Sequence, residues 1–251
     1  MSDSEKERLE LIFAKHAEEY HELVAAEDWQ GNFPRALGEI ATFAQKTVVE
    51  LGAGTGRVTM TIAPWAEKVL SFEASHHMMD MAATNISGRG LKNVTLAIAD
   101  NRKVPLSDAS ADIVIEGWSF GFTISQRQSQ WRTEADVLLA ESERLLRRGG
   151  TLIIVETLGT GFRMPSAPGT VLPVFYGYLE RQLGFASRWI RTDYRFQSLV
   201  QARRLIEMFF GCMVDYDLAE GSHVIVPECT GIWWKVFQEP QRRRPAVAFV
   251  I

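Results

Sequence analysis

The sequence predicts an α/β fold built on a mostly parallel sheet, and two observations predict it. Short runs rich in β-branched and other apolar residues alternate with stretches of helical periodicity. This alternation is typical of a parallel sheet covered by helices on both faces. In addition, Gly52, Gly54 and Gly56 directly follow the first of these runs. A glycine turn between a strand and a helix is the usual start of a nucleotide-binding α/β domain.

The strands and helices can be expected in order along the chain. Five strands are expected, at Thr47 to Leu51, Lys68 to Phe72, Val94 to Ala99, Asp112 to Ile115 and Thr151 to Val155. One helix should start at about Arg57, and Ser75 can cap a second, with Met78, Met79 and Ala82 on its inner side. A third, amphipathic helix is expected from Trp131 to Arg148, with Gly149-Gly150 as its C-terminal stop.

The spacing of the glycines in the turn restricts the class of ligand that the turn can bind. A dinucleotide fingerprint is G-x-G-x-x-G, but Arg57 stands where its third glycine belongs. Glu50 precedes the turn, and an acid there suits a ligand with an ammonium group more than one led by phosphates. The Gly-Lys-Ser/Thr of a P-loop is absent from the sequence.

Acidic residues follow the strands at the edge where open α/β sheets bind ligands. Glu73 ends the second strand about 20 residues beyond the glycine turn, the distance at which an acid binds ribose hydroxyls in such folds. Asp100-Asn101 follow the third strand and Glu116-Gly117-Trp118 the fourth. Glu73 and Asp100 could equally be helix caps, since capping acids are common at such positions.

Three motifs together resemble one known family. Val48 to Arg57 matches the glycine motif of class I S-adenosylmethionine-dependent methyltransferases, Phe72 to Met79 its acidic strand end, and Ala99 to Val114 its third motif. The chain resembles the broad small-molecule branch, the methyltransferase type 11 and 25 kind that includes quinone-biosynthesis enzymes. The resemblance covers roughly Glu39 to Thr157.

The resemblance implies a Rossmann-like, seven-stranded, mostly parallel sheet with helices on both faces, an N-terminal lid helix and an insertion after the fifth strand. We expect a single domain, 1–251, in five parts. These are a helical lid (1–33), a cofactor-binding core (34–157), a substrate-lid insertion with a helix (158–221), a closing strand (222–237) and a tail (238–251).

The resemblance also implies S-adenosylmethionine as cofactor and a role for each matched residue. Glu73 would accept the ribose hydroxyls, Asp100 the adenine amine, and Glu50 would meet the amino group of the methionine part. The full set of expected cofactor-binding residues is Glu50, Gly52, Ala53, Gly54, Gly56, Glu73, Ala74, Met78, Asp100, Asn101, Glu116 and Gly117. Met78, taken singly, also reads as ordinary core packing.

Methyl transfer from a sulfonium needs no covalent nucleophile, and a base only if the acceptor must lose a proton. The sequence identifies no catalytic residue; the weak candidates are Tyr20, His21, Glu116, Trp118 and His223. We expect no metal site. His76 and His77 are adjacent, so on a helix they point about 100° apart, and no third ligand stands at a suitable spacing.

The two ends of the chain are expected to complete the substrate site. One face of an N-terminal helix holds Leu9, Ile12, Phe13, His16, Ala17, Tyr20 and Val24, and Pro34 should open the next helix at its first position. This helix is either a lid over the cofactor, with Tyr20 near the methyl donor, or plain amphipathic packing.

The insertion mixes aromatic residues with arginines, which would suit an aromatic or carboxylate-bearing acceptor. They could equally be a small satellite core with solvated arginines. The residues are Phe162, Phe175, Tyr176, Tyr178, Phe185, Trp189, Tyr194 and Phe196, with Arg163, Arg181, Arg188, Arg191 and Arg195. Gln197 to Phe210 should be a helix and Ser222 to Phe237 a closing strand or hairpin, with Pro227 and Gly231 at an edge, bulge or turn.

Composition favours a cytoplasmic enzyme with a small-molecule partner. The net charge of −4 and a pI near 5.8 disfavour nucleic acid as a partner. No apolar run approaches the ~18 residues of a membrane span, so we expect no membrane partner, and the polar N-terminus predicts no signal peptide. Two cysteines, Cys212 and Cys229, suggest reduced thiols. The Arg242–Arg244 tail should be exposed.

Two other classes of function stay open. One is a nicotinamide-dependent oxidoreductase on a similar fold, which Arg57 and the Asp100 motif disfavour. The other is a non-catalytic S-adenosylmethionine-binding protein, because motifs that bind a cofactor do not report on turnover. The methyl acceptor, the methylated element (O, N, C or S) and the oligomeric state are not indicated by the sequence.

Overall fold

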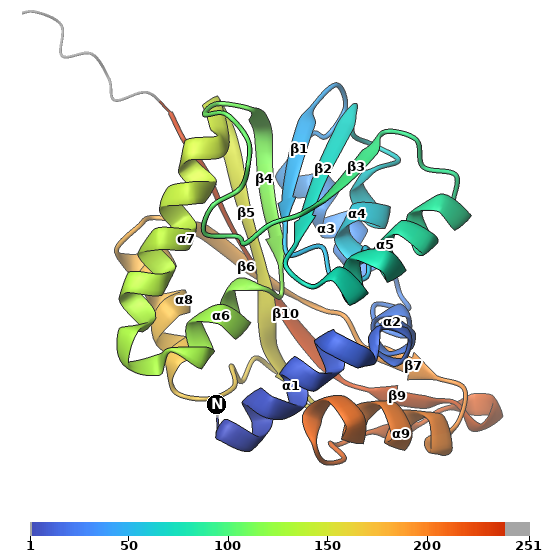
Figure 1. Ribbon diagram of the computed structural model, residues 1–251. Coiled ribbons are helices and arrows are strands. Elements are labelled where there is room, and N and C mark those ends of the chain that lie inside the picture. The colour runs from blue at the N-terminus through green and yellow to red at the C-terminus, as the bar shows by residue number, and fades with distance from the viewer. Residues whose placement is uncertain (1, 239–251) are drawn as a thin grey trace, which may run out of the picture.

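The computed structural model describes residues 2–238, in which helices cover both faces of a large, mostly parallel sheet (Figure 1). Its seven strands follow the order β3-β2-β1-β4-β5-β10-β6, and β10 runs antiparallel to both of its neighbours. The other pairings, from β3 to β5, are parallel. The predicted Rossmann-like fold class is confirmed. The strands are β1 (Thr47–Leu51), β2 (Lys68–Glu73), β3 (Val94–Ile98), β4 (Ala111–Gly117), β5 (Leu146–Thr160), β6 (Ala186–Arg191) and β10 (Glu228–Val236).

A second sheet of three short strands lies apart from the first, in the order β7-β9-β8. Its strands are β7 (Tyr194–Phe196), β8 (Asp217–Leu218) and β9 (Val224–Val226). The helices are α1 (Asp3–Lys15), α2 (Ala17–Ala25), α3 (Asn32–Ile40), α4 (Arg57–Ile62), α5 (His76–Gly88), α6 (Phe120–Gln126), α7 (Trp131–Leu145), α8 (Val171–Arg181) and α9 (Leu199–Phe210). Two single turns of 3-10 helix occupy Gln128–Gln130 and Glu220–Ser222.

The core is divided between the two faces of the large sheet, because successive side chains of a strand point to opposite sides. In β1, Val48 packs with Val58 and Ile62 of α4, whereas Val49 belongs to the cluster that covers Leu138 of α7. Figure 1 shows the result: α6, α7 and α8 lie on one face, and α3, α4 and α5 on the other. Strands buried on both faces explain the nearly continuous apolar runs of the sequence.

One end of the large sheet carries a cap. In Figure 1, α1, α2, α9 and the small sheet gather at the end where β4 leads into α6, which is the carboxyl end of the parallel strands. Leu23 of α2 packs in a separate apolar cluster with Phe196, Leu205 and Val224. The N-terminal segment and the later segments of the chain therefore meet above the edge at which the sequence places the site.

The N-terminal helix differs from the expectation, since it is two helices broken at His16. The first turn of α5 satisfies the backbone groups near the break. The Ser75 hydroxyl donates to the Phe13 carbonyl at 2.7 Å, and the Ala17 N–H donates to Nε2 of His77 at 3.2 Å. His77 thus fixes the start of α2.

Two other helix boundaries were wrongly predicted. The helix α3 begins at Asn32 and not at Pro34, because the Asp28 carboxylate accepts from the N–H groups of Asn32 and Phe33 at 2.8 and 2.9 Å. The helix α7 ends at Leu145 and not at Arg148. Gly149 and Gly150 instead exchange backbone hydrogen bonds with Phe237, as part of a long β5.

The prediction for Gly231 is also wrong. Gly231 is not at an edge or turn; it lies inside β10, opposite Glu156 of β5 and Trp189 of β6. The reason is packing, since a Cβ on Gly231 would come within 2.3 Å of the Trp233 ring. That ring is held in place by stacking on Tyr176, at 4.4 Å between centroids, and by its Nε1–H donating to Glu180 at 2.8 Å. Pro227, in contrast, does stand at a junction, between β9 and β10.

The Arg242–Arg244 prediction lies outside the described residues. Within residues 2–238, no helix combines the length and the apolar character that crossing a bilayer requires. Cys212 is exposed and Cys229 is buried, and neither is in a disulfide.

Gly231→Ala should lower the free energy of unfolding by about 1–3 kcal/mol, because the added methyl group overpacks a core that cannot yield at Trp233. Urea denaturation measures the change. Gly38→Ala is the matched control: Gly38 is an exposed position within α3 with nothing within 4 Å of its added Cβ. It should stabilise by about 0.5–1 kcal/mol. Equal effects of the two substitutions would contradict the packing argument.

Candidate functional site

The glycine turn is held against the ends of two neighbouring strands. The N–H groups of Gly52 and Ala53 donate to the Phe72 carbonyl at the end of β2, at 2.8 and 2.9 Å. Gly52, Gly54 and Gly56 have φ values of 77°, 54° and 90°, the left-handed region that favours glycine. A Cβ on Gly52 would lie 2.4 Å from the Cβ of Ser119. The turn therefore needs glycine both for its conformation and for the close approach of the β4–α6 connection.

Three of the residues expected at the cofactor meet around this turn. Glu73 accepts from the Gly54 N–H at 2.8 Å and from the Ser75 N–H at 2.9 Å, one on each carboxylate oxygen. The Asn101 amide donates to the Ser119 hydroxyl at 3.3 Å, beside Gly52. Met78 is buried, and its Cε lies 3.9 Å from the position of a Cβ on Gly54. Segments far apart in the sequence thus come together at one point.

Asp100 lies at the exposed rim of this arrangement. Its carboxylate accepts from the N–H, Nε and Nη2 of Arg102, at 2.8, 2.9 and 2.5 Å. The hydrogen bond from Arg102 lowers the pKa of Asp100, so it is ionised at neutral pH. Ala74 is exposed next to Glu73, and Ala53 and Gly56 are buried within the turn.

Glu50 faces away from solvent. Its carboxylate is 1% exposed and accepts from the Thr59 N–H at 3.1 Å, from the Ser71 hydroxyl at 2.7 Å and from the Thr59 hydroxyl. It thereby ties β1 to α4 and β2. Burial raises its pKa despite these bonds. In this arrangement Glu50 supports the glycine turn from beneath, which is a positioning role.

Glu116 is likewise engaged by the protein. One oxygen accepts from the N–H and hydroxyl of Ser119 and from the Phe120 N–H, and the other from the Val155 N–H, all at 3.1–3.2 Å. Burial raises the pKa of Glu116 to about 7. Burial, followed by the charge of Glu116, raises the pKa of Glu156 on the neighbouring strand well above its usual value. These two carboxyl groups fix the start of α6, and both oxygens of Glu116 already accept hydrogen bonds from the protein.

Gly117 and Trp118 form a tight turn at the end of β4. A Cβ on Gly117 would lie 2.7 Å from Cγ2 of Val58, and Trp118 has a φ of 56°, rare for a large side chain. The Trp118 ring lies 5.5 Å from that of Phe33, and the Arg57 guanidinium lies 3.9 Å from its centroid. Backbone strain of this kind gathers at functional sites, which agrees with a position facing the substrate.

The remaining weak catalytic candidates lie in three different places. Tyr20 is over the glycine turn, with Cε1 3.8 Å from a Cβ on Gly54, and burial raises its pKa to about 12. His21 makes 3.2 Å contacts with the Thr55 hydroxyl and the Asn85 amide, and burial lowers its pKa. His223 lies at a surface turn, in contact with Gln197 and the Glu220 carbonyl. Tyr20 alone among them is beside both the turn and Arg57.

Several buried charged and polar residues lie next to Tyr20 and Trp118, and their meeting was not predicted from the sequence. Arg57 donates to Glu27 at 2.6 Å, and Glu228 accepts from the Thr157 hydroxyl at 2.7 Å. Burial, followed by the charges of Glu27 and Glu228, raises the pKa of Tyr194. The sequence does contain a signal for such buried acids, which is an acid placed directly after an apolar β-branched run. Glu156 follows Ile153-Ile-Val, and Glu228 follows Val224-Ile-Val-Pro.

Four of the five arginines expected in the insertion have partners away from the glycine turn. Arg163 pairs with Asp217, Arg188 with Glu39, and Arg191 with Asp193. Arg195 lies over Trp29, 5.2 Å from the ring centroid. Of the aromatic residues, Phe175 and Phe185 belong to the main core and Phe196 to the cap. The structure therefore gives no support to an acceptor carboxylate bound by these arginines.

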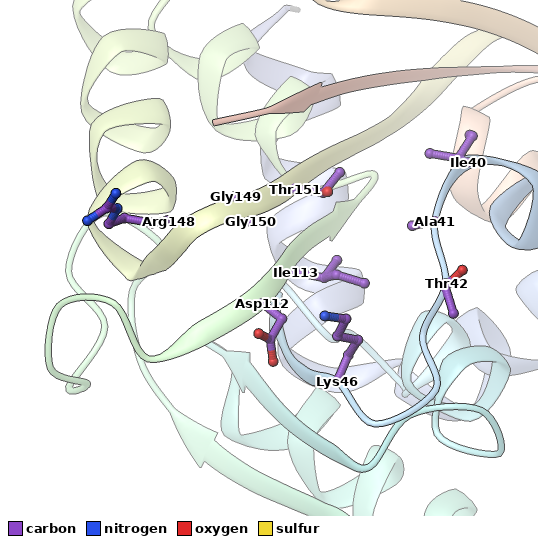
Figure 2. Close-up of a pocket in the computed structure, with 10 residues that line it drawn as sticks. All are labelled: Ile40, Ala41, Thr42, Lys46, Asp112, Ile113, Arg148, Gly149, Gly150 and Thr151. Carbon is purple, nitrogen blue, oxygen red and sulfur yellow. The ribbon is translucent and has the colours of Figure 1, made fainter. Parts of the chain in front are cut away.

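A surface pocket lies elsewhere, at the amino end of the sheet (Figure 2). There Asp112 accepts from the Thr47 N–H at 2.9 Å and from Arg147 at 2.7 Å. None of the expected site residues lines it, and open α/β sheets bind ligands at the opposite end. Its lining residues are Ile40, Ala41, Thr42, Lys46, Asp112, Ile113, Arg148, Gly149, Gly150 and Thr151. Among the described residues, no group of three His, Cys, Asp or Glu could hold a metal ion.

Comparison with known proteins agrees with the geometry. Residues 49–154 match the methyltransferase domain family. The uncharacterized methyltransferase YcgJ of Bacillus subtilis is 24% identical over 173 residues, 68% of this chain and 61% of the relative. Phosphoethanolamine N-methyltransferase 1 of Triticum aestivum is 29% identical over 126 residues, 49% of this chain but only 24% of the relative. The uncharacterized protein YafE of Escherichia coli is 30% identical over 110 residues, 44% of this chain and 49% of the relative. The chain thus spans less than two thirds of each.

Solved structures show the same fold. The crystal structure of YcgJ from Bacillus subtilis superposes with a TM-score of 0.51 at 15% identity, covering 83% of this chain and 99% of that one. A SAM-dependent methyltransferase from Aquifex aeolicus gives a TM-score of 0.51 at 16% identity, covering 81% and 89%. Together with the domain match, these define a Rossmann-like methyltransferase fold. The match over residues 49–154 assigns this part of the chain to the methyltransferase domain family.

Stability should fall as pH rises through neutrality, and Glu228 is one cause. Burial raises its pKa to about 8, against 4.5 in the unfolded chain. The folded state therefore holds the proton more tightly, and this stabilisation is lost between about pH 5 and 9. Glu228→Gln should remove part of that loss, raising the free energy of unfolding at pH 9 by on the order of 2 kcal/mol relative to the wild type, with little change at pH 5. Urea denaturation at the two pH values tests this; an effect independent of pH would contradict it.

Proposed function

We propose that this protein transfers the methyl group of S-adenosylmethionine to a small-molecule acceptor. One observation carries the proposal: the glycine turn, Glu73, Met78 and Asn101 converge at the carboxyl end of the sheet, with the Gly54 N–H on Glu73. The domain match over residues 49–154 supports the reaction class, and the name of the wheat relative supports a small acceptor.

The residues present fit the cofactor that the family implies. Gly52 to Gly56 expose backbone in the left-handed conformation, so a ligand can lie against the turn without meeting a Cβ. Each Glu73 oxygen has one backbone N–H and retains a lone pair for a ribose hydroxyl. Met78 offers an apolar surface, and Asp100 at the rim is an ionised acceptor for an exocyclic amine.

The bound cofactor supplies an activated methyl group on a sulfonium. The task of this chain is then to hold the acceptor atom in line with that methyl group and to exclude water. The turn of Gly117 and Trp118, fixed by Val58 and Arg57, is suited to orient the acceptor. The cap of α1, α2 and α9 is suited to exclude water, which agrees with the proposed lid (1–33) and substrate-lid insertion (158–221).

None of the described residues is proposed as a strong general base. Tyr20, with a pKa of about 12, stays protonated near neutral pH and can donate a hydrogen bond. Burial lowers the pKa of His21, and the Asn85 amide donor against Nδ1 favours a neutral ring with that nitrogen as the acceptor. A reaction whose acceptor needs no strong base fits these groups best.

The first experiment is calorimetric titration with S-adenosylhomocysteine, with NADH as the control. Micromolar binding of S-adenosylhomocysteine alone is expected. Binding of NADH alone would favour the oxidoreductase alternative. Tight binding of S-adenosylhomocysteine without methyl transfer to any of a broad acceptor panel would favour a non-catalytic binding protein.

Glu73→Ala should weaken S-adenosylhomocysteine binding by roughly 1.5–3 kcal/mol, the scale of hydrogen bonds to a charged group. The same titration measures the loss. Glu39→Ala, which removes a surface partner of Arg188, is the matched control and should leave the affinity unchanged. Unchanged affinity in Glu73→Ala would remove Glu73 from the ribose site.

Asp100→Ala should cost less than Glu73→Ala, because Asp100 is exposed and shares its carboxylate with Arg102. The loss should be larger for S-adenosylhomocysteine than for S-inosylhomocysteine, which lacks the exocyclic amine. Titration of both ligands gives the comparison. Equal losses would break the assignment of Asp100 to the adenine.

A further inference from the structure

The acid cluster, which we define as Glu27, Arg57, Tyr194 and Glu228, contains polar atoms that the protein does not use. Five buried side-chain atoms of the described residues have no hydrogen-bond partner, and three of them are here: Oε1 of Glu27, Nη2 of Arg57 and Oε2 of Glu228. Buried polar atoms are rarely left without a partner, so three in one place indicate a missing ligand.

The charges of the cluster indicate the sign of that ligand. Glu27 and Glu228 are 9% and 2% exposed, and Arg57 is the cation paired with Glu27. Burial, followed by the charge of Glu27, raises the pKa of Glu228 to about 8, so Glu228 holds its proton at neutral pH. A cation beside the two groups favours the ionised form of Glu228, and both free oxygens then accept hydrogen bonds from it. A cation with several N–H groups supplies donors and charge together.

The cluster borders the proposed cofactor site through Tyr20. The ring of Tyr20 lies over Gly54, and its hydroxyl is near enough to Arg57, Glu27, Glu73 and Glu156 for all four to shift its pKa. Arg57 also lies over Trp118, the residue at the end of β4. Its side chain keeps 17% exposure, so the cluster is not sealed from solvent.

We propose that Glu27 and Glu228 bind a protonated amino group of the methyl acceptor, beside Tyr20 and Arg57. The inference rests on the proposed function, and it gives the acceptor a class: a small primary amine. The free Nη2 of Arg57 adds one donor, so an amine that also carries an oxygen satisfies all three unpartnered atoms. Arg163, Arg188 and Arg191 are each paired with a carboxylate of the protein, so these three arginines do not favour an acidic acceptor over an amine.

The test uses two matched series of small molecules. Ethanolamine, ethylene glycol and glycolate form one series; tyramine, 4-ethylphenol and 4-hydroxyphenylacetate form the other. Each is titrated into the full chain, with and without S-adenosylhomocysteine, while the indole N–H signal of Trp118 is followed by NMR and assigned with Trp118→Phe. The amine of at least one series should bind about tenfold more tightly than its neutral and acidic counterparts, the scale of one charge-assisted bond.

Variants connect the binding to the cluster. Glu228→Gln and Glu27→Gln should each weaken amine binding about tenfold or more while leaving S-adenosylhomocysteine affinity unchanged. Glu39→Gln, on a surface ion pair, should change neither. The proposal is overturned if no amine binds, if the neutral or acidic counterpart binds as well, or if both variants keep the wild-type affinity. If the wild-type protein binds the amine but not S-adenosylhomocysteine, the proposed function is overturned and the amine site is retained.

Discussion

The contact between the glycine turn and the β4–α6 connection is the constraint on which the site depends. Gly52 and Ser119 approach so closely that a Cβ on Gly52 would lie 2.4 Å from that of Ser119. Through Ser119 the contact extends to Asn101, to Glu116 and to the Leu51 carbonyl. The ends of β1, β3 and β4 are thereby fixed relative to one another. A larger residue at position 52 would separate them, and the acceptors and donors around the turn would no longer share one ligand.

Buried carboxyl groups are the second theme of this edge. Glu50 and Glu116 have backbone or hydroxyl donors on both carboxylate oxygens and act as positioning residues. Glu27 and Glu228 are not saturated. The difference matters because a buried acid is tolerated when donors surround it and is costly when they do not. The same residue type at neighbouring strand ends thus divides into acids that hold the fold and acids that are available to a ligand.

The sequence was most informative where the backbone itself makes the site. The turn at Gly52 to Gly56 and the strand ends at Glu73 and Asp100 follow from local patterns, and they lie where those patterns predicted. What could not be predicted depends on long-range packing. Gly231 is required by Trp233 two residues on, and Glu50 is turned inward by Thr59 and Ser71. Glu27 meets Arg57 because α2, which precedes Glu27, packs on α5 and α9. The insertion arginines suggested an acidic acceptor because sequence does not reveal their surface partners.

The position of β10 has a consequence for synthesis. This strand lies between β5 and β6 in space, yet it is the last strand of the described chain to leave the ribosome. Until residues 228–236 emerge, the edge of β5 around Ile153 to Val155 is unpaired and β6 has no neighbour in the large sheet. An apolar open edge of this kind is prone to pair with other chains. The nascent protein therefore passes through a period of exposure that ends only when β10 inserts, which makes that interval a natural point for chaperone protection.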